Sequence, residues 1–63
     1  MIVALFDTTA GTTVYINPAH VVSVRPDPAD PDHNSILKLR DGEAVYVRGG
    51  HEEIAGKLTR SAA

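Results

Sequence analysis

Short apolar segments separated by turn residues dominate the sequence, and most of them have the length of a β-strand. Their valine, isoleucine, threonine and tyrosine residues favour strands over helices. The segments end at glycine, proline, asparagine or aspartate residues, which are typical of turns. We therefore predict five strands, at residues 1–6, 13–17, 21–25, 35–40 and 43–48, with a bend between the second and the third.

The first segment differs from the others because its apolar residues, Met1 to Phe6, run without polar alternation. Such a run predicts a strand that is covered on both faces. The run ends at Asp7 and lacks a basic flank, so it is too short to span a bilayer or to direct secretion. We therefore expect no membrane insertion.

Asp41 and Gly42 predict a β-hairpin between the last two strands, and two loop lengths give different faces. A two-residue loop pairs Arg40 with Glu43, whereas a three-residue loop pairs Leu39 with Glu43 and places Gly42 in the left-handed conformation. We prefer the three-residue loop because it gathers four aliphatic side chains on one face. These are Leu37, Leu39, Val45 and Val47. The other face then carries Ile36, Lys38, Arg40, Ala44, Tyr46 and Arg48.

The last segment has helical spacing, since Ile54, Ala55 and Leu58 fall on one stripe. Acidic residues near its start and basic residues near its end also favour a helix, over about residues 50–60. The Pro- and Asp-rich segment 26–34 offers nothing to bury and is expected to be an exposed connection. The fold class predicted is α+β and β-rich. A single small domain, residues 1–63, should form a strongly bent antiparallel sheet of about five strands followed by a short C-terminal helix.

The order of these elements resembles the FlbD-like, or SwrD-like, family of small bacterial flagellar proteins. The segments that carry the resemblance are VYINPAHVVSV, LKLRDGEAVYV and HEEIAGKL. The resemblance implies a small cytoplasmic protein linked to flagellar motor output, without catalytic residues. The strand, DG turn, strand and helix are also similar to part of the longer and more basic LytTR DNA-binding domain.

A chain of 63 residues buries a small core, and small domains often add disulfides, a metal or a second copy of themselves. This chain has no cysteine, which removes disulfides and thiolate zinc sites and is consistent with a reducing cytoplasm. We therefore expect a homo-oligomer that also contacts an unidentified protein partner. The predicted interface consists of Ile2, Val3, Leu5, Phe6, Ile54 and Leu58.

The cations on the second hairpin face suggest two alternative partners. The long aliphatic stems of these Lys and Arg residues could simply cover the sheet, which explains the face without any ligand. We give this explanation the same weight as a contact surface for a partner. As a contact surface the face could bind nucleic acid, which the net charge of −2 disfavours, or a small phosphorylated ligand held by an oligomer. Glycines ahead of the helix either form a strand-to-helix joint or offer amides to an anion. The candidate binding residues are Arg25, Lys38, Arg40, Tyr46, Arg48, Gly49 and Gly50.

The sequence carries no catalytic or metal-binding signature. His20, His33 and His51 are widely separated and form no HxxxH or HExxH pair. The aspartates of segment 26–34 do not match an EF-hand loop, and no serine lies in a GxSxG elbow. We therefore predict neither an enzyme nor a metal or cofactor site.

Overall fold

The computed structural model describes the backbone of residues 3–62 and the side chains of residues 3–60. It contains five strands, a short 3-10 helix (η1) and a C-terminal α-helix. The elements are β1 (Ala4–Asp7), β2 (Thr13–Ile16), η1 (Pro18–His20), β3 (Val21–Pro26), β4 (Asn34–Leu39), β5 (Ala44–Arg48) and α1 (His51–Ala62). The β-rich α+β fold predicted from the sequence is confirmed, and the helix ends two residues beyond the expected boundary.

The strands form two antiparallel sheets that meet at one point. One sheet contains β1 and β2, and the other has the order β3-β4-β5. A bridge between Thr8 and Val47 joins β1 to β5, and the Thr9 amide donates to the Tyr46 carbonyl at 3.1 Å. The two sheets therefore form one strongly bent ribbon in the spatial order β2-β1-β5-β4-β3.

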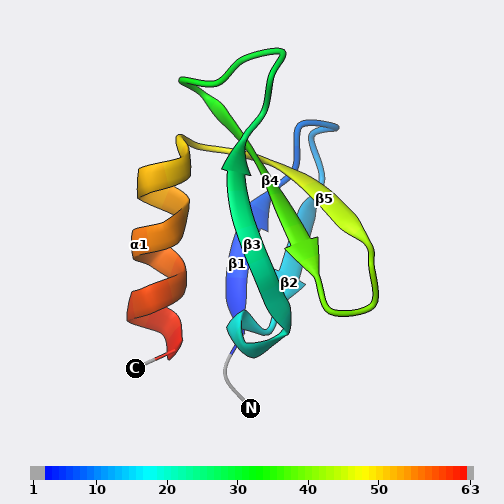
Figure 1. The fold of residues 1–63 in the computed structure, drawn as a ribbon, viewed down its shortest axis with the longest axis vertical. Coiled ribbons are helices and arrows are strands. Elements are labelled where there is room, and N and C mark those ends of the chain that lie inside the picture. Colours follow the sequence, from blue (N-terminus) through cyan, green and yellow to red (C-terminus); the bar gives the residue numbers. More distant parts are fainter. Residues whose placement is uncertain (1–2, 63) are drawn as a thin grey trace.

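Helix α1 covers the inner side of this ribbon and lies alongside β3 (Figure 1). The apolar core forms between the helix and the two sheets. Its buried members are Ala4, Phe6, Ile16, Leu37, Val47, Ile54 and Leu58. Within the described part of the chain, no helix is long and apolar enough to cross a membrane.

The hairpin between β4 and β5 has the register that we preferred from the sequence. Leu37 pairs with Val45, and the Leu39 amide donates to the Glu43 carbonyl at 2.8 Å. Gly42 has a φ of 91° and donates its amide to the Leu39 carbonyl at 3.0 Å, so the loop has three residues. The aliphatic face is confirmed as the inner one, because Leu37 is fully buried.

Strand β1 is covered on one face only, which corrects the expectation of burial on both faces. Ala4 and Phe6 point into the core, whereas Val3 is 46% exposed and Leu5 is 44% exposed. The single helix covers the inner side of the ribbon, and nothing in the described chain covers the outer side of β1. An uninterrupted apolar run cannot reveal this asymmetry, because it reads the same on either face.

Segment 26–34 is not wholly exposed, and its first and last residues, Pro26 and Asn34, belong to β3 and β4. Asp27 is buried, contrary to expectation, and its carboxylate accepts a hydrogen bond from the Ala29 amide at 2.9 Å. The Asp27 amide donates to the Asn34 carbonyl at 3.1 Å. The aspartate is buried because its side chain satisfies the local backbone.

The joint between β5 and α1 is held by hydrogen bonds to His33, which precedes β4, and to Ser35 on β4. The Gly49 amide donates to the His33 carbonyl at 2.6 Å, and the Gly49 carbonyl accepts from the fully buried Ser35 hydroxyl at 2.7 Å. Gly49 has a φ of 123°, and an added Cβ would lie 3.0 Å from Ile54 Cδ1. The positive φ therefore favours glycine at this position, and a Cβ there would make the Ile54 side chain shift.

We predict that Gly49→Ala destabilises the protein by about 1–3 kcal/mol, because alanine is strained at positive φ and its methyl group collides with Ile54. Gly42→Ala is the matched control, since Gly42 also has a positive φ but open space around it. Urea unfolding followed by circular dichroism measures both variants. Equal losses of stability in the two variants would show that contact with Ile54 is unimportant.

Candidate functional site

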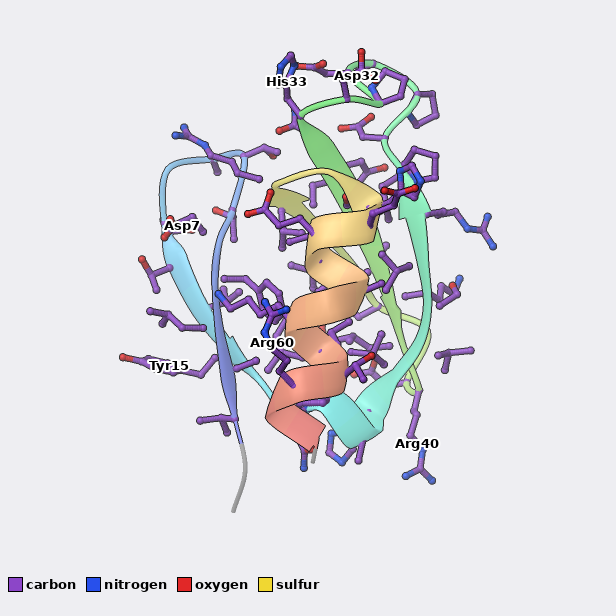
Figure 2. The ribbon with its side chains drawn as sticks, turned by 90° about the vertical axis from the view of Figure 1, so that its left-hand side faces the viewer. Asp7, Tyr15, Asp32, His33, Arg40 and Arg60 are labelled. Carbon is purple, nitrogen blue, oxygen red and sulfur yellow. The ribbon has the colours of Figure 1, made fainter. Side chains whose placement is uncertain are left out.

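The outer face of the β1-β2 hairpin carries three exposed apolar side chains, Val3, Leu5 and Tyr15, which we call the apolar patch. Leu5 pairs directly with Tyr15, so their side chains lie next to each other on the same face. Val3 precedes Leu5 by two residues and shares that face. Tyr15 is 73% exposed and projects away from the body of the molecule (Figure 2).

Lys57 on α1 anchors the β1-β2 hairpin from the inner side. Its Nζ donates to the Leu5 carbonyl and lies 4.8 Å from the centre of the Phe6 ring. The ammonium group thus satisfies a backbone acceptor that β2 does not reach, and it gains a cation–π contact. The hairpin is fixed to the helix, while the apolar patch faces outward.

The outer face of β3, β4 and β5 carries a second exposed surface, which we call the basic face. Cross-strand pairing places Arg25, Ile36 and Tyr46 in one row across the three strands. Adjacent rows contain Lys38 beside Ala44, and Arg48 beside Asn34. The sequence prediction that these cations share a face is confirmed by this register.

All the charged side chains on the basic face are positive. No aspartate or glutamate occupies an outward position of the three strands. The ion pair that the described side chains form joins His33 to Asp30, so the cations of the basic face have no carboxylate partner there. Arg40 lies beyond the end of β4, where its amide donates to the His20 carbonyl at 2.8 Å, and its side chain extends from that end of the molecule (Figure 2).

The surroundings of the two glycines before α1 do not favour an anion-binding site. The Gly49 amide is already bonded to the His33 carbonyl. A hollow of about 300 Å³ beside Gly50 is lined by Pro31, Asp32, His51 and Glu52, and its two acidic residues disfavour an anion. The close packing at the joint explains these glycines without a ligand.

The predicted interface residues differ in where the structure places them. Phe6, Ile54 and Leu58 are packed into the chain's own core, so they are not available to a second copy while the chain is folded. Val3 and Leu5 remain exposed, and Ile2 lies outside the described residues. Tyr15 was missing from the predicted set, although the alternation of TVYI places it opposite the buried Ile16 and could have identified it.

The described residues contain no group of three histidine, cysteine, aspartate or glutamate side chains that could hold a metal ion. Ser35 is fully buried and donates its hydroxyl hydrogen to Gly49, which makes it structural. An open hollow of about 450 Å³ is lined by His20, Leu39, Arg40 and Asp41. The surfaces described above are therefore the best candidates for function.

No family model matches this chain, and no curated protein or solved structure matches it either.

The loop between β3 and β4 carries a titratable contact. His33 Nδ1 lies 2.9 Å from an Asp30 carboxylate oxygen, and this hydrogen bond together with the carboxylate charge raises the pKa of His33 above its ordinary value of 6.5. Both side chains are exposed, so solvent screens the attraction. The contact lies within the exposed loop and does not involve the core.

We predict that Asp30→Asn lowers the pKa of His33 in an NMR titration of its ring protons, whereas Asp41→Asn at the far hairpin leaves it unchanged. Because folding raises this pKa, the contribution of the pair to stability is full below pH 6.5 and disappears as the pH rises through the folded-state pKa. A His33 titration that is identical in wild type and Asp30→Asn would contradict the contact.

Proposed function

We propose that this protein is a non-catalytic interaction protein that acts as a homo-oligomer, with the apolar patch as the contact between copies. The observation that carries the proposal is the exposure of Val3, Leu5 and Tyr15 together on one face of a two-stranded hairpin. Scattered apolar residues are ordinary on a protein surface, but adjacent ones on one ribbon form a contact surface.

The small core supports this proposal. A two-stranded hairpin is marginally stable by itself, and the β1-β2 pair gains its packing from the inner face alone. Burying apolar surface contributes about 25 cal/mol per Å², so covering the outer face adds to the stability of a hairpin that is packed on its inner face only. Two such ribbons packed face to face would lie about 10 Å apart, as sheets do in sandwiches.

Charge favours the apolar patch over the basic face as the contact between copies. Two copies of the basic face would bring Arg25, Lys38 and Arg48 against the same cations, and like charges repel. The apolar patch carries one charged neighbour on its strands, Asp7, whose carboxylate accepts a hydrogen bond from the Thr13 hydroxyl at 3.3 Å. Self-association through the apolar patch therefore avoids strong repulsion.

The biological setting that we propose rests on the resemblance to the FlbD-like family. The element order quoted for that resemblance includes a strand ending in YINP and a strand pair joined by a DG turn. A role near the flagellar motor, in the cytoplasm and through a protein partner, is the setting that this resemblance suggests.

We predict that Leu5→Asp converts the oligomer into a folded monomer, measured by size-exclusion chromatography with light scattering and by circular dichroism. A buried leucine contributes about 1.5–3 kcal/mol, so its loss raises the dissociation constant by at least about tenfold. Val22→Asp is the matched control, because Val22 is 65% exposed but lies on β3, away from the apolar patch. Phe6→Asp, in contrast, should unfold the chain, since Phe6 is only 2% exposed.

Two results would contradict the proposal. One is a wild-type protein that is monomeric at every concentration up to the millimolar range. The other is an oligomer whose mass is unchanged by Leu5→Asp.

A further inference from the structure

Tyr46 is an exposed aromatic side chain within the basic face. Tyr46 is 48% exposed, and its cross-strand partner Ile36 is half-buried beside it. Ala44, two residues earlier on β5, keeps the surface beside the ring low. Tyr46 on β5 and Ile36 on β4 therefore form a small apolar area next to the cations, which a planar ligand can cover.

Cations surround this area on three sides. Alternate residues on a strand are about 7 Å apart and neighbouring strands about 5 Å apart. Arg48 therefore lies one step along β5 from Tyr46, Lys38 lies diagonally across on β4, and Arg25 ends the same row on β3. The long side chains of all three can reach a ligand that covers the ring.

Charge segregation makes this arrangement selective for an anion. The chain carries more acidic than basic residues, yet Arg25, Lys38, Arg40 and Arg48 account for four of its six Lys and Arg residues. The carboxylates lie instead on the hairpin turn, the 26–34 loop, the start of α1 and the end of β1. A polyanion is therefore attracted to the sheet face and repelled at its borders.

We infer that the basic face binds single-stranded nucleic acid, with Tyr46 stacking on a base and Arg25, Lys38 and Arg48 contacting phosphates. Stacking platforms with cations along the backbone path are the usual way in which proteins bind single strands without reading sequence. A duplex hides its base faces and would leave Tyr46 without a partner. An acidic peptide or an anionic membrane would use the cations but not the ring.

The inference is independent of the proposed self-association, since the basic face and the apolar patch lie on different sheets. The acidic borders limit the site to a few nucleotides. With about three phosphates contacted, the slope of log affinity against log salt should be about −2 for a single strand.

The test is fluorescence anisotropy with a labelled oligothymidine of twelve nucleotides, repeated over a range of salt concentrations. Tyr46→Ala should weaken binding by about tenfold, because stacking accounts for much of the affinity. Tyr15→Ala is the matched control, an exposed tyrosine on the apolar patch, and should bind like wild type. Tyr46→Phe should also bind like wild type, and circular dichroism establishes that each variant is folded.

Charge is tested in the same assay. Arg48→Gln should weaken binding and reduce the salt slope by about 0.7. Arg60→Gln removes the same charge from the exposed end of α1 and should leave both unchanged. The competitors are a hairpin duplex, poly-glutamate and phosphatidylserine vesicles, each of which should displace the labelled oligothymidine poorly.

Four outcomes would overturn the inference. They are absence of binding at low salt, a flat salt response, equal effects of Tyr46→Ala and Tyr15→Ala, and displacement by duplex, poly-glutamate or vesicles as effective as by unlabelled single strand.

Discussion

One helix has to cover a ribbon that has two sides, and this constraint organises the whole structure. The hydrogen-bonded joint at Gly49 directs α1 across the inner side, where Ile54 and Leu58 meet Phe6 and the second sheet. Lys57 ties the helix to the Leu5 carbonyl and so fixes β1 at the same time. No element in the described part of the chain covers the outer side, so the apolar patch and the basic face stay exposed when the core closes in this way.

The two exposed surfaces differ in chemistry and therefore suit different contacts. The apolar patch has little charge and lies on the less supported two-stranded sheet, which gains stability when it is covered. The basic face lies on the three-stranded sheet, whose inner residues Leu37 and Val47 are fully buried, and it needs no cover. The proposed self-association through one sheet would thus leave the other free for the proposed anionic partner.

Local signals in the sequence predicted most of the fold. The Asp41-Gly42 turn fixed the register of the β4-β5 hairpin, because only one loop length put the aliphatic residues on one face. The exposure of β1 could not be predicted, since Val3 and Leu5 are as apolar as the buried Phe6 and the difference depends on where the helix lies. The same tertiary choice buried Ile54 and Leu58, two of the predicted interface residues. Asp27 is buried through hydrogen bonds to its own loop, which composition does not reveal.

The most direct test of the central claim is an isotope-filtered nuclear Overhauser experiment on a mixture of labelled and unlabelled protein at about millimolar concentration. The account predicts contacts between copies from the methyl groups of Val3 and Leu5 to the ring of Tyr15. Contacts confined to single molecules, or contacts between copies that involve β3 and β4 instead, would contradict it.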